Sequence, residues 1–307
     1  MLTFLHLNVY LLFFASAVLG ISAALLWAGN GVYLVKVSKK DRLQTNSGIM
    51  WAMLQSSLVT GAIFLLYVLH SEELSNSFDF IYIVFASATA LGIVILLLLP
   101  STTNSSEEQV GVVSVRDDEQ HLLPDPIPNE ASPPSSLKQL KQFFTLMFSP
   151  RMLCLSCVFV FTGLEMAFYT GVFTSCLSST LALKNITKYV VPISVLSIGF
   201  GQILGGAVTG PLTKKWQIKS SSIIVFALFC HLIAFALIFV SLPYDSTTQS
   251  TDAATILNPA LPIVLIISCL LGISDAFWQT QIYVIIGSLY KNETANAFAV
   301  FKFFQVC

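Results

Sequence analysis

Seven long stretches of this chain are apolar almost throughout, and they limit its possible folds more than any other feature. They cover about residues 8–34, 47–69, 79–99, 152–176, 189–212, 221–241 and 261–287, and an eighth begins near residue 295. A helix of roughly 20 apolar residues crosses the hydrocarbon core of a bilayer. Because 55% of the residues are hydrophobic and 10% are charged, too little polar surface remains to cover a soluble globule. The sequence therefore predicts an all-α, polytopic membrane protein in a lipid bilayer.

The basic residues of the loops predict how the chain is oriented. Most of the 15 Lys and Arg residues fall in the loops after the first, third, fifth and seventh spans: Lys36, Lys39, Lys40, Arg42, Arg116, Lys138, Lys141, Arg151, Lys214, Lys215, Lys219 and Lys291. The alternate loops hold only Lys184 and Lys188. Loops rich in Lys and Arg remain in the cytosol. We therefore expect the long loop 101–150 to be cytosolic and the sequon at Asn185 to face the other side, where it can be glycosylated.

The long loop divides the chain into three expected parts: a transmembrane part at 1–100, a disordered cytoplasmic linker at 101–150, and a second transmembrane part at 151–307. The linker is rich in Ser, Asn, Glu, Asp and Pro, a composition typical of disorder. Residues 137–148 regain Leu, Phe and Lys, which predicts an amphipathic helix at the membrane interface.

A short stretch of the linker, from Asp118 to Leu123, is similar to the acidic dileucine signals that sorting adaptors read. Asp118, Leu122 and Leu123 would carry such a signal, which predicts a clathrin adaptor as partner and an endosomal or lysosomal membrane as location. A solvated acidic linker without a signal is the alternative, and the plasma membrane then remains open.

An internal repeat relates the two ends of the chain. The letters LGIS, followed by a Trp, a side-chain amide and a Tyr, occur in the same order at 19–33 and 271–283. The next segments match in register as well, with Asn46 and Gln55 in one and Asn296 and Gln305 in the other. Two consecutive matches indicate a duplication. Parallel repeats of this kind are typical of secondary transporters.

Two acidic residues, Glu165 and Asp275, lie near the middle of predicted spans. A charge at that depth costs about 3 kcal/mol on insertion scales, so such residues face protein or a cavity rather than lipid. They indicate either a proton- or cation-coupled site or a structural lock between helices, with Lys302 as a partner for Asp275. His231 also lies mid-span, and we expect a neutral imidazole that is bonded to a backbone carbonyl.

Other patterns limit the function. The glycine-rich run 199–210 contains two G-x-x-x-G spacings, which predict close helix packing. The sequence contains no nucleophile–base arrangement, no metal-ligand cluster and no basic stripe interleaved with aromatic residues. We therefore expect no catalytic residue, no enzyme activity, no metal, no cofactor and no nucleic-acid partner.

Several of these segments together resemble the Unc-93-like branch of the major facilitator superfamily. They are LGISAALLWAGNG at 19–31, NSGIMWAMLQSS at 46–57, TGLEMAFYTGVF at 162–173, IGFGQILGG at 198–206, HLIAFALIF at 231–239, LGISDAFWQTQ at 271–281 and AFAVFKFFQ at 297–305. The resemblance implies a fold of twelve helices in two halves. On that scale the chain holds seven to eight helices, four to ten plus part of eleven, and is expected to be a fragment.

The resemblance also implies a central cavity and a role. In that fold six helices line the cavity: four, five, seven, eight, ten and eleven. They would bring together these residues: Trp27, Asn30, Gln55, Glu165, Gln202, Asp275, Gln279 and Lys302. Proteins similar to this family act as regulatory or accessory subunits of an ion channel or a membrane receptor, which implies a membrane-protein partner. The alternative is a secondary active transporter of a small solute, coupled to protons or cations.

Overall fold

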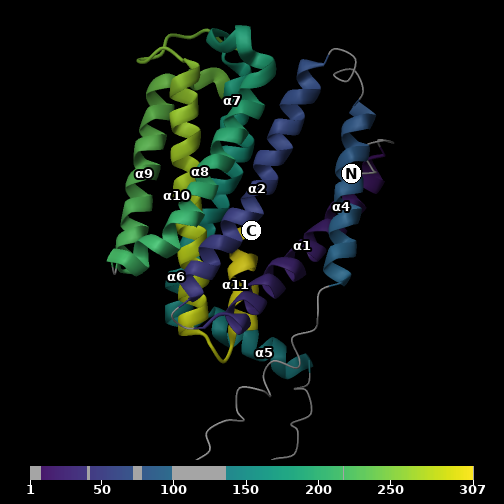
Figure 1. The fold of residues 1–307 in the computed structure, drawn as a ribbon, viewed down its shortest axis with the longest axis vertical. Helices are drawn as coiled ribbons and strands as arrows, with labels where there is room; N and C mark the ends of the chain where they lie inside the picture. Colours follow the sequence, from purple (N-terminus) through teal and green to yellow (C-terminus); the bar gives the residue numbers. More distant parts are fainter. Residues whose placement is uncertain (1–7, 40–41, 72–77, 99–135, 217, 307) are drawn as a thin grey trace, which may run out of the picture. The chain divides into compact units, whose positions relative to one another are not determined.

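The structure is a computed structural model that describes residues 8–39, 42–71, 78–98, 136–216 and 218–306 (Figure 1). Within these ranges every regular element is helical, apart from one isolated bridge between Thr180 and Thr251. Seven helical stretches within the described residues are long and apolar enough to cross a membrane. The predicted all-α, polytopic membrane fold is thus confirmed. The dileucine motif at Asp118–Leu123 lies outside the described residues.

The described chain forms two compact units. The first comprises Met1–Ala15 and Ser77–Leu140, and its main element is the helix α4 (Phe78–Leu97). None of the 18 residues in the most apolar window of α4 is buried. An uninterrupted apolar surface of this length is what a membrane-spanning helix presents to lipid.

The second unit, Ser16–Asn76 and Lys141–Cys307, contains most of the helices. In chain order they are α1 (Val9–Val37, which starts in the first unit), α2 (Leu43–His70), α5 (Ser136–Met147), α6 (Pro150–Ala167), η3 (Phe168–Phe173), α7 (Thr174–Ser179), η4 (Leu181–Ile186), α8 (Thr187–Trp216), α9 (Ser220–Ser241), η5 (Tyr244–Thr247), α10 (Leu261–Leu289) and α11 (Thr294–Val306). The helix expected at 137–148 is confirmed by α5, and the eighth apolar stretch by α11.

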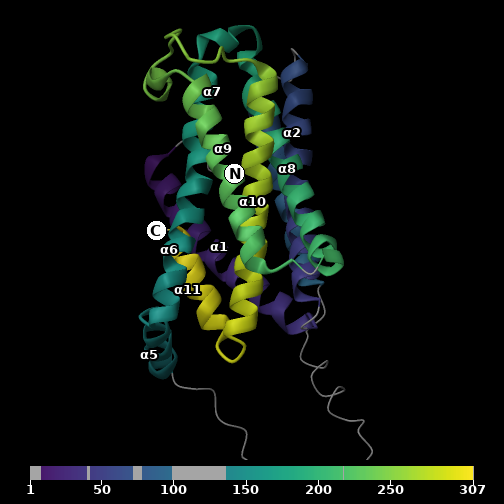
Figure 2. The same cartoon turned by 90° about the vertical axis from the view of Figure 1, so that its left-hand side faces the viewer.

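Helix α10 is the most deeply buried element of the second unit. Between Leu271 and Tyr283 every residue except Ile273 is buried. Figures 1 and 2 show α8 and α9 beside it, and α2 packs on α8 and also contacts α10. A helix that is apolar and buried on most of its faces is the interior helix of a bundle, so polar groups on α10 must find partners inside the protein.

Glycines hold α8 closely against two neighbours. A Cβ on Gly205 would come 2.7 Å from the Cβ of Ala276 on α10, and one on Gly206 would come 2.7 Å from the backbone oxygen of Gly48 on α2. The close packing predicted from the two G-x-x-x-G spacings is confirmed, and the two spacings serve different partners. Small residues at such seams let helix backbones approach each other.

The fourth span is interrupted by a π-helical segment. After α6 the chain continues as η3, a π-helix over Phe168–Phe173, and then as α7. The hydroxyl of Thr170 donates to the backbone oxygen of Met166 at 2.6 Å, beside this irregular turn. A π-helical turn changes the direction in which the following side chains point and often occurs at functional sites. Here it follows Glu165 and carries the buried Tyr169.

Candidate functional site

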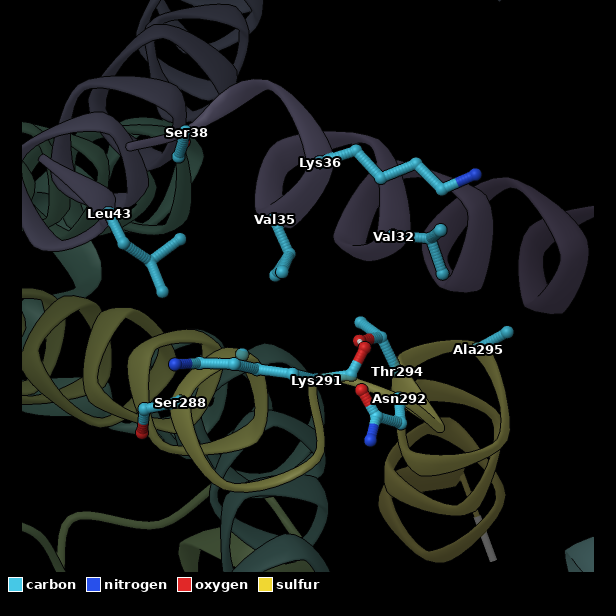
Figure 3. Close-up of a pocket in the computed structure, with 11 residues that line it drawn as sticks. Val32, Val35, Lys36, Ser38, Leu43, Ser288, Lys291, Asn292, Thr294 and Ala295 are labelled. Carbon is cyan, nitrogen blue, oxygen red and sulfur yellow. Dashed lines mark hydrogen bonds between the residues drawn. The ribbon is translucent and has the colours of Figure 1, made fainter. Parts of the chain in front are cut away.

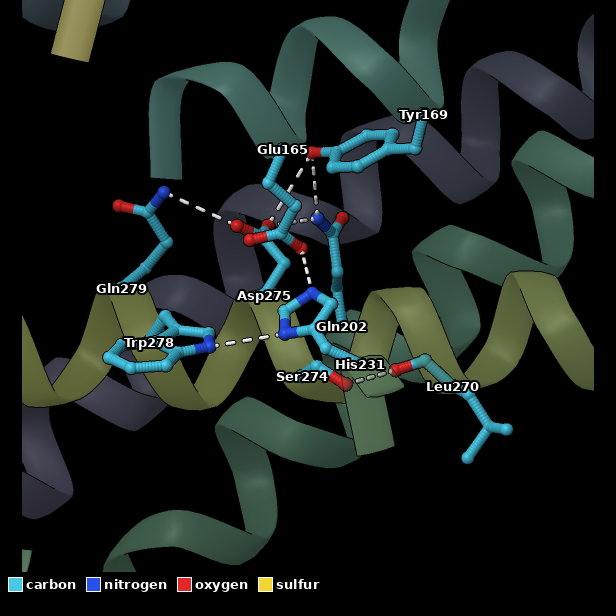
Figure 4. A network of polar contacts seen from close by, with 9 residues as sticks. All are labelled: Glu165, Tyr169, Gln202, His231, Leu270, Ser274, Asp275, Trp278 and Gln279. Atoms are coloured by element: carbon cyan, nitrogen blue, oxygen red, sulfur yellow. Dashed lines mark hydrogen bonds and ion pairs between the residues drawn. The ribbon is translucent and has the colours of Figure 1, made fainter. Parts of the chain in front are cut away.

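A cluster of polar side chains lies inside the second unit, where α6, η3, α8, α9 and α10 meet (Figure 4). Helix α10 supplies three of them, at spacings of three and four residues that bring side chains to one face of a helix. We call this cluster the buried polar network: Glu165, Tyr169, Gln202, His231, Asp275, Trp278 and Gln279.

Glu165 and His231 form one side of the network. Their contact joins the carboxylate Oε1 to the imidazole Nε2, and both residues are at most 2% exposed. The indole Nε1 of Trp278 donates to His231 Nδ1 at 3.1 Å. Because an indole N–H can only donate, Nδ1 must accept, so the imidazole proton lies on Nε2 and is donated to Glu165. Glu165 Oε2 is buried and has no partner within the described residues.

Aromatic rings fix the position of His231. Phe161 meets the imidazole edge-on at a centroid distance of 5.7 Å, and Phe235 stacks on it at the same distance. Such contacts restrict rotation of the ring and favour one geometry. The imidazole is thereby held between the carboxylate of α6 and the indole of α10.

Asp275 forms the other side of the network and is fully buried. Gln202 donates to its Oδ2 at 2.5 Å, Tyr169 donates to the same oxygen at 3.5 Å, and Gln279 donates to Oδ1 at 3.3 Å. These donors are all neutral. Asp275 also interacts electrostatically with Glu165. Two buried carboxyl groups this close raise each other's energy when both are ionised.

A line of amides connects Asp275 to α11. Gln305 donates to Gln279 at 3.3 Å and to Thr162 at 3.2 Å, while Lys302 donates to Gln305 at 2.6 Å. Among the described residues no ion pair joins Lys302 directly to Asp275. In the structural-lock alternative, Lys302 and Asp275 would therefore act on each other electrostatically, with two amide side chains between the charges.

The remaining cavity candidates flank this line. Gln55 on α2 donates to Gln202. Lys302 lies over the ring of Trp27, with Nζ 4.8 Å from the centroid. Asn30 is outside the network and donates to the sulfur of Met50 at 3.4 Å. The structure thus links six of the eight candidate residues by side-chain contacts, in part through Gln305; Glu165 interacts with them only electrostatically, through Asp275, and Asn30 lies apart.

Sequence reasoning missed part of this arrangement. It predicted a backbone partner for His231, which agrees with the backbone hydrogen bond at Ala227, but it did not predict Glu165, which contacts the imidazole from 66 positions away in the sequence. It did not predict a role for Trp278, although Trp278 lies in the repeat, and it placed Tyr169 on the same helix face as Glu165 without counting it among the cavity residues. The internal repeat, which pairs Gln305 with Gln55, was the one available signal that Gln305 contributes to the same region.

Two cavities of the second unit adjoin these helices. One, of about 580 Å³, lies between α1, α2, α6 and α11 and includes Lys302 and Trp27 in its wall. The other, of about 630 Å³, lies between the α1–α2 and α10–α11 connections (Figure 3). Lys36 and Lys291 are among the side chains that line it. Within the described residues no group of three or more His, Cys, Asp or Glu could hold a metal ion.

The fold and the buried polar network define a class: a multi-pass helical membrane protein whose polar groups are collected inside the helix bundle. The family model described as ion channel regulatory protein UNC-93 matches residues 1–307. The chain belongs to the UNC-93 family. UNC-93 is described as a family of ion channel regulatory membrane proteins, not as a family of enzymes.

Individual relatives support the same assignment. The chain is 32% identical to UNC93-like protein MFSD11 of Xenopus laevis over 297 residues, which cover 94% of this chain and 65% of the relative. It is 24% identical to UNC93-like protein 3 of Arabidopsis thaliana and 25% identical to protein unc-93 homolog A of Mus musculus, covering 59% and 66% of those proteins and 95% and 97% of this chain. The chain thus spans less than two thirds of the length of the Xenopus and Arabidopsis relatives. No solved structure matches.

Proposed function

We propose that the chain is part of a regulatory or accessory membrane protein that controls the activity or the trafficking of an ion channel or a membrane receptor. The match of the UNC-93 family model to residues 1–307 carries this proposal. The closed geometry of the site supports it, because Glu165 and Asp275 are at most 2% exposed and their partners are side chains of the same unit. We propose three parts, 1–100, 101–150 and 151–307, and no catalytic activity.

Co-purification tests the accessory role. The tagged chain is crosslinked in native membranes, solubilised and analysed by quantitative mass spectrometry. An unrelated multi-pass protein expressed at the same level is the control. We expect one channel or receptor in a fixed ratio to the chain, with a current or surface level that changes when the chain is depleted. No enrichment over the control, together with no such change, would contradict the proposal.

A secondary transporter is the second candidate. The electrostatic interaction between Glu165 and Asp275 favours it, because a carboxyl pair inside a helix bundle can exchange a proton or a cation. The test is proton- or cation-dependent solute flux in liposomes. Asp275→Asn should abolish such a flux, whereas Asp79→Asn, on α4 of the first unit, should not. A flux that is the same in both variants would rule out Asp275 as the coupling residue.

We also propose that the protein resides in endosomal or lysosomal membranes and that a clathrin adaptor reads Leu122-Leu123. Replacing both by Ala should move a tagged protein towards the plasma membrane, as measured by surface biotinylation. The matched control is Val112→Ala with Val113→Ala, an apolar pair in the same linker. If neither pair changes the location, the linker acts only as a solvated connection.

A further inference from the structure

The cavity of about 580 Å³ beside α11 combines an apolar wall with one buried cation. Its volume is within the range typical of small-molecule sites, roughly 300–1,000 Å³. Ala23 and Ala24 of α1, Met166 of α6 and Phe303 of α11 contribute to the wall. Lys302 projects from α11 as the one Lys or Arg in the lining and is 8% exposed.

The described partners of Lys302 are neutral. Its Nζ donates to Gln305 Oε1 at 2.6 Å and lies 4.3 Å and 4.8 Å from the ring centroids of Phe301 and Trp27. Asp275 interacts with it electrostatically, but the amides of Gln305 and Gln279 stand between them. A buried cation without a directly paired anion is costly inside a membrane protein, and it is stabilised when an anion binds beside it.

A second donor at the same wall lacks an acceptor. Trp51 lines the cavity and is 4% exposed, and its indole Nε1 has no hydrogen-bond partner within the described residues. The rings of Trp27 and Trp51 lie 6.4 Å apart. The wall thus holds one cation whose partners are neutral and one indole N–H without an acceptor among the described residues, and most of the remaining lining is apolar.

We propose that this cavity binds an amphipathic monoanion: a single apolar chain that carries one carboxylate, with the carboxylate paired to Lys302. One cation matches one negative charge, and the alanines of α1 leave room for the apolar chain. Leu25 and Phe303 line the cavity and are 72% and 50% exposed, so the apolar chain can reach the cavity past these two side chains. The inference does not depend on the proposed regulatory function, and its failure would leave that function untouched.

Tryptophan quenching tests the proposal on the purified chain in detergent. Brominated stearate quenches indoles that it contacts, and Trp27 and Trp51 are in the wall. We expect saturable quenching that unbrominated stearate reverses. Lys302→Met should weaken binding about tenfold or more, since a hydrogen bond to a charged group is lost, whereas Lys302→Arg should stay close to the original affinity. Brominated methyl stearate, which has no charge, should bind the original chain as weakly as the acid binds Lys302→Met.

Ala23→Phe provides an independent test, because it narrows the cavity without changing a charge and should also weaken binding. If Lys302→Met does not fold, Ala23→Phe still tests whether the cavity binds the acid. Equal affinity of the acid for the original chain and Lys302→Met, equal affinity of acid and ester, or unchanged binding by Ala23→Phe would overturn the proposal. Competition by phosphatidylglycerol as strong as that by stearate would assign the cation to a membrane phospholipid and would overturn the single-chain carboxylate.

Discussion

The contact between Glu165 and His231 joins two side chains that are each costly to bury alone. His231 supplies the proton to Glu165 Oε1, and Oε2 has no other partner among the described residues. Trp278 occupies the opposite nitrogen of the imidazole. Removing one member therefore leaves the other buried without its partner. This costs more stability than replacing both members by apolar residues of similar size.

His231→Leu should lower the free energy of unfolding by about 3 kcal/mol, because it leaves the Glu165 carboxylate buried and unpaired. The double variant with Glu165→Gln should recover part of this loss. Thermal unfolding in detergent, monitored by tryptophan fluorescence, measures both. Leu232→Ala is the control, since Leu232 is the neighbour of His231 and is 55% exposed. Additive effects of the two substitutions would show that they do not form a pair.

Sequence alone identified the individual charges of the network but not their partners. Glu165 and Asp275 stand out because each is an isolated acid in an apolar stretch. The partner of Glu165 depends on how α9 packs on α6, and no local pattern encodes that. The partnership of Asp275 with Lys302 was anticipated as one alternative, but the positions of the two residues gave no information about Gln279 and Gln305, which lie between them.

At the scale of helices, the seams between α8 and its neighbours determine whether the network can form. A Cβ on Gly272 of α10 would come 3.0 Å from the backbone nitrogen of Gln202 and closer still to the backbone oxygen of Ile198. Both contacts are with backbone atoms, which cannot rotate away as the end of a flexible side chain can. The same segment of α8 holds the amide that donates to Asp275.

Gly272→Ala should therefore push α8 away from α10 and lower the free energy of unfolding by about 1–3 kcal/mol. Gly29→Ala is the matched control, because a Cβ on Gly29 of α1 meets nothing within 4 Å. Thermal unfolding of the two variants makes the comparison. If both unfold at the temperature of the original chain, the seam tolerates a methyl group and the close approach is not required.

Helix positions were mostly predictable, because hydropathy alone determines which segments enter a membrane. The two G-x-x-x-G spacings also predicted close packing, although not that one faces α10 and the other α2. The π-helical segment η3 was not predicted. Its sequence FYTGVF contains no residue that breaks a helix more strongly than Gly171, so the irregular turn depends on tertiary packing.

At the scale of the whole molecule, the orientation of the chain remains a prediction from its basic residues. Asn185 should carry a glycan, because it is exposed in η4, next to a loop on the side with few Lys and Arg. Endoglycosidase treatment of the cell-expressed protein should shift its mobility, and Asn185→Gln should remove the shift. Asn292, exposed between α10 and α11, should remain bare. A glycan on Asn292 instead would invert the topology.

The fold class was predictable for a general reason. A chain with so few charged residues has to place its backbone polar groups in helices once it enters lipid. The choice of neighbours within the bundle is a different matter, because many arrangements of apolar helices bury similar areas. The location of the 580 Å³ cavity could not be predicted either, because it depends on how α1 and α11 pack together.

The hydrogen bonds of the amides that lead to Asp275 have a common direction. From α2, Gln55 donates to Gln202, which donates to Asp275; from α11, Gln305 donates to Gln279, which also donates to Asp275. A carboxylate accepts and does not donate, so it sets this direction for every member. A proton on Asp275 can be accepted by the hydroxyl of Tyr169, which is able to accept as well as donate, or by a facing amide that turns around and whose neighbour follows. Lys302 can only donate to Gln305, so the amides of Gln305 and Gln279 cannot reverse their direction. Of the two lines of amides, only the one that leads to Gln55 on α2 can therefore reverse.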